Sequence, residues 1–321
     1  YRRLAAKQTA QAAEHGLAAQ RQQTVQQATL AYFDLTQSHH AVALLEDAVQ
    51  TARDYQAQVG KAVQLGLAFK GDEIRAFAQV SRLELRLSQA LDRRRADAAR
   101  LAQLLRLKIT ESLRPADDRP LPLTLVDGRR KLDELVKGAL AKRPELMEAG
   151  ALHEAARHQD DAAKYAPLYP TLGAQVFAGG LGGSTSSARR DFANSTDTYV
   201  TLSWKLGAGG LFDSSRTAGA EARLRQTQLA ETKTREEVVR QVVEAQAHVT
   251  YLGQQLKIAQ AAIRSAEQGY QLSLTRKEFA VGIVLEALQS QQDLIQARLD
   301  YAATVGELNK AQVRLKTAAG E

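Results

Sequence analysis

Few residues of this sequence have the type and spacing that chemistry requires. There is no cysteine, which excludes disulfides, thiol catalysis, cysteine-based zinc sites and acylation within this segment. His39 and His40 are adjacent and therefore project from different sides of a helix, which predicts solvated side chains and no shared metal. His153 and His158 lie near two aspartates but lack the i, i+4 spacing, and we interpret them as surface residues too.

No phosphate-binding or nucleophile motif occurs. Neither GxxxxGK[ST] nor GxSxG is present, and no helix follows the glycines of FAGGLGGS. The formal charge of +7 and the pI near 9.5 would permit nucleic-acid binding, but Lys and Arg alternate with 36 acidic residues, as on a solvated helix face. We therefore predict no catalytic residue, no metal ligand, no cofactor, no nucleic-acid partner and no enzyme.

The elements around these residues are expected to be long helices. Only 5% of the residues are aromatic, while Ala, Leu, Gln, Arg and Glu are abundant, which is typical of helices packed side by side. All six prolines lie between Pro115 and Pro170. Apolar and small residues recur every three or four positions from about Leu4 to Val63, which predicts a helix about 90 Å long.

The stretch QLGLAFKGDE ends this first helix. Gly66 and Gly71 flank a short turn, and Asp72 is placed to cap the helix that follows, expected from about Glu73 to Lys108. Two helices joined by so short a link fold back antiparallel.

The second half of the chain repeats this plan. Helices are expected at about 214–279 and 286–317, with a break at Gly282. Ala31 of ATLAYFDL precedes Gly66 by 35 residues, and Ala247 of EAQAHVTYL precedes Gly282 by 35 residues, so the two halves register with an offset of 216. The sequence therefore predicts an internal duplication.

A Pro- and Asp-rich connection separates the halves. After TESLRPADDRPLPLTLVDGRR we expect two shorter helices, about 131–141 and 144–164, with Pro144 in the first turn of the second. YAPLYPTL then stops the helix.

Residues 171–206 change from a helical to an alternating pattern. Leu172, Ala174 and Val176 share one face, and a second alternating run covers 200–206, with a polar loop GGLGGSTSSARRDFANSTD between them. Runs of nine or ten residues with Tyr165, Tyr169 and Trp204 near their ends fit transmembrane β-strands, and they also fit a soluble hairpin packed on a helix. In lipid such a hairpin must pair with further strands, from a duplicate elsewhere or from other subunits.

The sequence has no run of about 18 apolar residues and therefore predicts no transmembrane helix. Residue 1 already lies within a helical pattern, YRRLAAKQTAQAAEHGLAAQ, without a signal-peptide core, and we expect the natural N-terminus to lie upstream.

Taken together, these segments resemble the TolC-type outer-membrane efflux proteins. The resemblance rests on the order and spacing of ATLAYFDL, LGLA with DEIRA, AVGIVLEALQSQQDLIQARLDY, RPEL, YAPLYPTLGAQV and LSWKLGAGGLFDSSR over essentially the whole chain. It implies a mainly α fold of long antiparallel coiled-coil hairpins in two repeats, with a β-hairpin that contributes to a trimeric transmembrane β-barrel. It implies further an outer-membrane duct with a periplasmic helical extension, passive and homotrimeric, that works with a periplasmic adaptor and an inner-membrane transporter in a tripartite efflux or type I secretion system.

The resemblance also assigns residues. Gly66, Leu67, Gly282 and Ile283 would form the periplasmic tip that docks the adaptor, and Asp72, Glu73 and Glu286 would line the pore constriction, Asp72 keeping its alternative role as a helix cap. Val200, Leu202 and Trp204 would face lipid, Thr201, Ser203 and Lys205 the lumen, and the loop at Arg189 and Arg190 the exterior. The stretch from Gly282 to Glu286 is two residues shorter than that from Gly66 to Asp72, and the second turn lacks the polar residues that are usual in the family.

The expected organisation has five blocks. They are a first-repeat helical hairpin without its leading helix and β-hairpin (1–112), a linker (113–130), short helices (131–170), the β-hairpin (171–210) and the second-repeat helical hairpin (211–321). A periplasmic adaptor and a soluble coiled-coil scaffold are the alternative functions. An adaptor has lipoyl and barrel modules around one helical hairpin, and a scaffold leaves the alternating strands unexplained.

Overall fold

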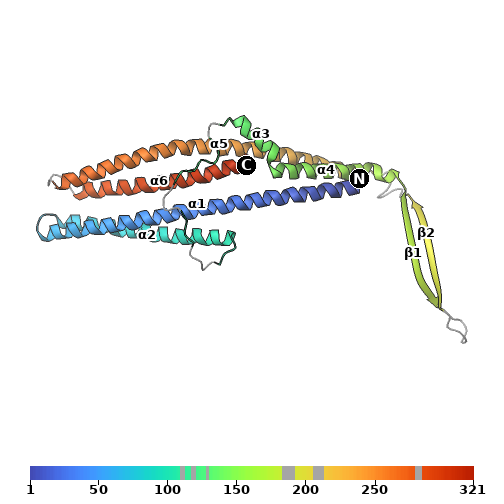
Figure 1. Ribbon diagram of the computed structural model, residues 1–321, viewed down its shortest axis with the longest axis horizontal. Coiled ribbons are helices and arrows are strands. Elements are labelled where there is room, and N and C mark those ends of the chain that lie inside the picture. The colour runs from blue at the N-terminus through green and yellow to red at the C-terminus, as the bar shows by residue number, and fades with distance from the viewer. Residues whose placement is uncertain (109–112, 117–120, 128–129, 183–191, 205–212, 279–283) are drawn as a thin grey trace. The chain divides into compact units, whose positions relative to one another are not determined.

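Four long helices make up most of the fold (Figure 1). The computed structural model describes residues 1–321 except 109–112, 117–120, 128–129, 183–191, 205–212 and 279–283. Helices α1 (Arg2–Gln64) and α2 (Lys70–Leu104) form one antiparallel hairpin, and α5 (Ser214–Glu278) and α6 (Val284–Ala318) form another. Their lengths of 63 and 35 residues in the first hairpin and 65 and 35 in the second confirm the predicted repeat.

Shorter elements connect the two hairpins. They are α3 (Leu132–Lys142), α4 (Pro144–Tyr165), the 3₁₀ turn η1 (Ala166–Leu168), and the strands β1 (Thr171–Gly182) and β2 (Phe192–Ser203). Pro144 is the first residue of α4, as predicted, because a proline at that position loses no helical hydrogen bond. The two strands pair antiparallel.

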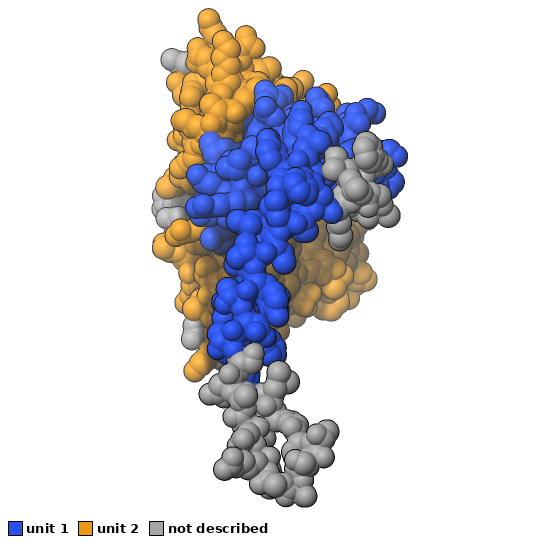
Figure 2. Space-filling model, turned by 90° about the vertical axis from the view of Figure 1, so that its right-hand side faces the viewer, with its two compact units in different colours: residues 1–17, 144–235 blue, residues 18–143, 236–321 orange. Residues whose placement is uncertain are grey.

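The chain divides into two compact units, shown blue and orange in Figure 2. Unit 1 comprises residues 1–17 and 144–235, and unit 2 comprises residues 18–143 and 236–321. The sequence blocks that we expected remain a prediction.

The core of unit 2 is a seam of small and branched side chains along α1. One cluster contains Leu45, Ala48, Val49 and Ala52 of α1 with Val80 and Leu83 of α2 and Ile295 of α6. A second cluster joins Tyr55 and Val59 to Ala287 and Leu288, and a third joins Ala31 and Leu35 to Leu101. Alanines at the contacts let helix backbones approach closely, which is why few aromatic residues are needed.

The connection after α2 is tied to α6 by two amide side chains. Asn309 accepts a hydrogen bond from the Leu123 amide (2.8 Å) and donates one to the Leu121 carbonyl (2.9 Å). Gln312 accepts hydrogen bonds from the amides of Leu125 (3.2 Å) and Val126 (3.0 Å). Both amide side chains are buried, so this extended segment is fixed without secondary structure of its own.

Several predicted boundaries differ from the structure. Helix α2 begins at Lys70 and not at Glu73, and it ends at Leu104. The loop predicted at 179–197 is shorter, since β1 continues to Gly182 and β2 begins at Phe192. Backbone pairing extends the strands through glycine and polar residues that do not alternate in hydropathy.

Candidate functional site

The β-hairpin of unit 1 has one apolar and one more polar face next to its helix-proximal end. Leu172 pairs with Leu202 and Ala174 with Val200, while Thr171 pairs with Ser203 and Gly173 with Thr201. Directly opposed residues of an antiparallel pair lie on the same face. The structure therefore places Val200 and Leu202 together and separates them from Thr201 and Ser203, as the alternation predicted.

The large side chains of the hairpin's apolar face are exposed. Leu172, Val176, Val200 and Leu202 each expose more than half of their surface. Each strand has 12 residues, which corresponds to about 40 Å. Trp204 is also exposed but lies just past the end of β2, and Lys205, Arg189 and Arg190 fall outside the described residues.

Aromatic residues stand where the helices of unit 1 meet the strands. Tyr165 ends α4 and Tyr169 follows η1, and both side chains are exposed. Exposed Tyr and Trp at the ends of an apolar strand surface are typical of a membrane interface.

The turn between α1 and α2, in unit 2, exposes apolar side chains. Gly66 has a φ of +74°, and hydrogen bonds from Gly66 N to Val63 O (3.0 Å) and from Leu67 N to Ala62 O (2.8 Å) close the helix end. Leu67 is 79% exposed and Phe69 is 82% exposed. Gly282 and Ile283, the matching residues of the second repeat, lie outside the part of the chain that the structure describes.

The three acidic residues that we assigned to a constriction each have a basic partner. Asp72 pairs with Arg75 (3.2 Å), Glu73 with Lys70, and Glu286 with Arg276 (2.8 Å). Their carboxylates are thus neutralised locally in this conformation, and their pore role remains a prediction.

The alternative role of Asp72 as a helix cap is wrong. The N-cap of α2 is Phe69, which makes no side-chain cap hydrogen bond, and Asp72 lies inside the first turn. The Asp72 side chain is only 12% exposed, and its negative charge is favourable at this positive end of the helix.

Tyr55 of α1 lies close to residues of α2, α5 and α6 in unit 2. Burial, the negative charge of Asp72 and the neighbouring Tyr270 together raise the pKa of its hydroxyl from 10.0 to about 12, and burial contributes most. The pKa of Tyr270 is also raised by burial. Nothing in the sequence surroundings of Tyr55 indicated these neighbours.

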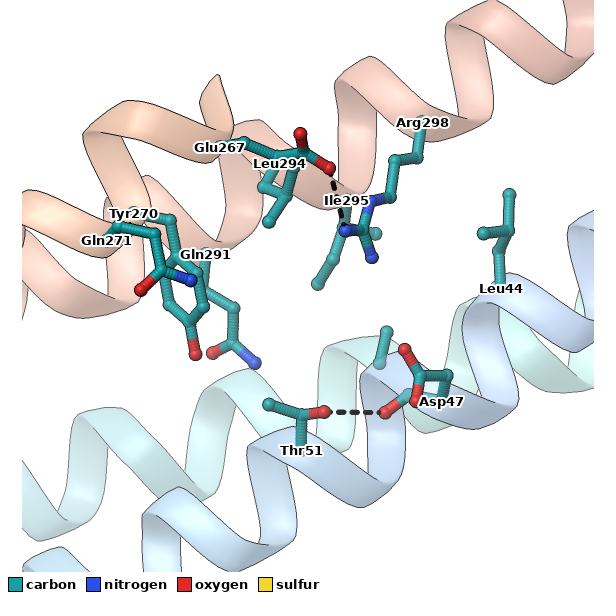
Figure 3. Close-up of a pocket in the computed structure, with 11 residues that line it drawn as sticks. Leu44, Asp47, Thr51, Glu267, Tyr270, Gln271, Gln291, Leu294, Ile295 and Arg298 are labelled. Atoms are coloured by element: carbon teal, nitrogen blue, oxygen red, sulfur yellow. Dashed lines mark hydrogen bonds and ion pairs between the residues drawn. The ribbon is translucent and has the colours of Figure 1, made fainter. Parts of the chain in front are cut away.

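Helices α5 and α6 are joined by polar contacts along the same region. The Ser273 and Ser290 hydroxyls lie 2.7 Å apart, and Arg298 donates to Glu267 at 3.0 Å. Figure 3 shows Glu267 and Arg298 at one side of a cavity that is also lined by residues of α1.

The histidines show one correction. His40 is buried, with 5% exposure, so its predicted solvated position is wrong, because α1 is covered at this point within unit 2. His153 lies 2.7 Å from Glu231 of α5, and His158 lies 3.9 Å from Asp161. Among the described residues, no group of three or more His, Cys, Asp or Glu side chains is arranged to hold a metal ion.

A search of the described helices for one both long and apolar enough to cross a membrane gave no candidate.

The fold thus consists of two repeated helical hairpins with an amphipathic strand pair between them in the sequence. The model of the outer membrane efflux protein family matches residues 135–321, and the chain belongs to this family. It is thus an outer-membrane protein of the TolC type, and the family description is that of an efflux protein and not of an enzyme.

Solved structures share the fold. A membrane protein from Pseudomonas aeruginosa is 22% identical with a TM-score of 0.85, over 99% of this chain and 73% of that one. VceC of Vibrio cholerae is 19% identical with a TM-score of 0.82 (99% and 74%), and the CmeC channel of Campylobacter jejuni is 14% identical with a TM-score of 0.86 (98% and 66%). A comparison with curated protein sequences gave no match.

Proposed function

We propose that this protein is a subunit of a homotrimeric exit duct in the outer membrane of a Gram-negative bacterium. In this proposal the trimer forms a passive, water-filled path from the periplasm to the exterior. A periplasmic adaptor docks at the helical tips, and an inner-membrane transporter supplies the energy, as in a tripartite efflux or type I secretion system.

The β-hairpin is the observation that carries the proposal. Its exposed apolar face would be unfavourable in water but is stabilised against lipid tails. A length of about 40 Å spans the apolar layer when a strand is tilted. The two faces support a lipid-facing role for Val200 and Leu202 and a lumen-facing role for Thr201 and Ser203. A lipid-facing Trp204, just past the end of β2, continues the same alternation.

The outer edges of the two strands, unpaired in the part of the chain that the structure describes, support an oligomer. In the hydrocarbon layer every backbone N–H and C=O needs a partner, and the outer edges of β1 and β2 lack one among the described residues. Further hairpins from this protein and from other subunits would satisfy these edges in a closed barrel, and a three-fold assembly is the arrangement that the resemblance implies.

Family membership supports the duct over the adaptor and the scaffold. The exposed Leu67 at the first turn fits a tip that receives a partner, and Gly66 shapes that turn.

Membrane fractionation, sedimentation in detergent and planar-bilayer recording together test this proposal. We expect the full-length protein in the outer-membrane fraction, a particle of three chains, and discrete conductance steps after reconstitution. A soluble monomer or dimer without conductance would overturn the proposal, and the hairpin would then need another partner surface.

A further inference from the structure

A cavity of about 290 Å³ lies inside unit 2, between α1 of the first helical hairpin and α5 and α6 of the second (Figure 3). The buried cluster around Ala48 and Ile295 borders it. Its volume is close to the lower end of the range of about 300–1,000 Å³ that is common for ligand sites. A ligand of this cavity is therefore small.

One buried polar group points into the cavity without a partner. Gln291 of α6 exposes only 5% of its surface, and its amide has no hydrogen-bond partner among the described residues. Figure 3 shows this amide in the space between the helices. The amide faces the cavity, so a molecule there can form hydrogen bonds with a polar group that no protein atom among the described residues satisfies.

The charges around the cavity sum to one negative charge. Glu267 is neutralised by Arg298 at 3.0 Å, whereas the carboxylate of Asp47 has no ion-pair partner within the described ranges. The main-chain carbonyl of Asp47 accepts the Thr51 hydroxyl at 2.9 Å, and this bond leaves its carboxylate available. These three ionic side chains and the neutral Tyr270 hydroxyl are the titratable groups that line the cavity.

The remaining lining is largely apolar. Ala48, Leu294 and Ile295 are buried, Leu44 is partly buried, and the ring of Tyr270 adds an aromatic surface. The aromatic face of Tyr270 and the negative charge of Asp47, at different sides of the cavity, each favour a cation (Figure 3).

We infer that this cavity binds a small organic cation, with its ammonium group at Asp47, its apolar body against Leu294 and Ile295, and a polar group within reach of Gln291. Asp47 is exposed at the edge of the cavity, and its uncompensated carboxylate repels an anion and favours a cation over a neutral molecule.

Such a ligand would contact both helical hairpins at once. If the duct opens by movement of one hairpin against the other, a ligand that bridges them stabilises the conformation described here and reduces opening. This consequence for the channel rests on the proposed function, whereas the binding itself does not.

Two probes that differ in charge test the inference. We would titrate the purified full-length protein in detergent with tyramine and with tyrosol, which share a phenol group and differ only in an amine or an alcohol, and follow binding by saturation-transfer NMR. The amine is expected to bind at least tenfold more tightly than the alcohol. Equal binding of the two probes would overturn the inference.

Matched variants locate the site. Asp47→Asn should remove most of the preference for the amine, and Gln291→Leu should weaken the binding of both probes several-fold. Asp54→Asn and Gln292→Leu make the same changes at exposed positions of α1 and α6 outside the cavity and should have no effect. Amine binding that is unchanged in Asp47→Asn, or lost equally in Asp54→Asn, would contradict the assignment.

Conductance separates the two proposals. Pores that form without any amine binding would support the duct and contradict the cation site. Amine binding at Asp47 in a protein that forms no pores would support the cation site and contradict the duct. Where both hold, the amine should lower the open fraction of the wild-type channel and leave the Asp47→Asn channel unchanged.

Discussion

Tyr55 is a residue whose surroundings determine its chemistry. Its ring packs with Val59, Ala287 and Leu288, while Asp72 and Tyr270 lie near enough to affect its hydroxyl. A tyrosine in these surroundings is kept neutral, because its ionised form would be both poorly solvated and repelled.

Replacing Tyr55 by Phe should change alkaline stability. The folded pKa is raised from 10.0 to about 12, so the stabilisation by neutral Tyr55 is fully present below pH 10 and is lost as the pH rises from about 10 to 12. We expect the wild type to lose stability in this window more steeply than Tyr55→Phe. Guanidinium denaturation at several pH values between 8 and 11.5 measures this difference.

The control for this experiment is Tyr251→Phe, an exposed tyrosine of α5. It should follow the wild type at every pH. If Tyr55→Phe also followed the wild type, the hydroxyl would not be held neutral by its neighbours.

Lys310 is a buried cation that connects α1 to α6. It is 6% exposed and lies 2.7 Å from Asp34 and 2.6 Å from Glu307. Replacing it by Met leaves both carboxylates without their partner, and since these remain partly exposed we expect a loss of about 2–4 kcal/mol in unfolding free energy.

Denaturant unfolding of Lys310→Met against Lys316→Met measures that loss. Lys316 is exposed on the same helix, and its replacement should change stability by less than about 0.5 kcal/mol. Equal effects of the two substitutions would show that the ion pairs of Lys310 contribute nothing specific.

At the scale of elements, the helices could be predicted well because their signals are local. The restriction of proline to 115–170 and the apolar period indicate each long helix to within a few residues. The start of α2 was missed because Phe69 begins the helix without a capping side chain, so Asp72 was the only visible signal. The strand ends were missed because Gly179–Gly182 has no alternation.

Contacts between distant segments could not be predicted. The hydrogen bonds of Asn309 and Gln312 join segments more than 180 residues apart, and Tyr55 and Tyr270 belong to different repeats. Neither a period nor a motif encodes such pairings. The cavity at Gln291 likewise depends on three helices at once.

The two faces of the β-hairpin predict opposite tolerance to charge. Val176 and Gln175 are adjacent near the middle of β1, and Val176 shares its face with Leu172 and Ala174. If this face meets lipid, Val176→Arg should cost about 2–4 kcal/mol of membrane insertion, while Gln175→Arg should be tolerated.

Outer-membrane yield and heat resistance of the oligomer in detergent report this difference. Both substitutions introduce an arginine at adjacent positions of β1, so they differ only in the face of the hairpin that carries the charge. Similar yields of both variants would contradict a lipid-facing Val176.

For the whole molecule, the repeat of the helical hairpin and the copies of the chain in a trimer determine how many acidic residues lie near the helix turns. The two hairpins of one chain bring Asp72, Glu73 and Glu286 to the region of the helix turns, and a trimer would carry three copies of each. In the present conformation Arg75, Lys70 and Arg276 neutralise them. The selectivity of the proposed duct therefore depends on whether these bases stay paired, and not on the number of acids alone.

Arg276→Gln should make the proposed channel more selective for cations. It releases Glu286 from its 2.8 Å ion pair, so three uncompensated carboxylates would face the pore in a trimer. Because the pair is solvent-exposed, the free energy of unfolding should change little, by less than about 1 kcal/mol.

Reversal potentials in a potassium chloride gradient measure the ratio of cation to anion permeability. This ratio should rise severalfold in Arg276→Gln and return to the wild-type value in the double variant with Glu286→Gln. Arg264→Gln, which removes an exposed arginine of α5 away from the turn, should leave the ratio unchanged. If Arg264→Gln raised the ratio as much as Arg276→Gln, the effect would come from overall charge, and Glu286 would not line the constriction.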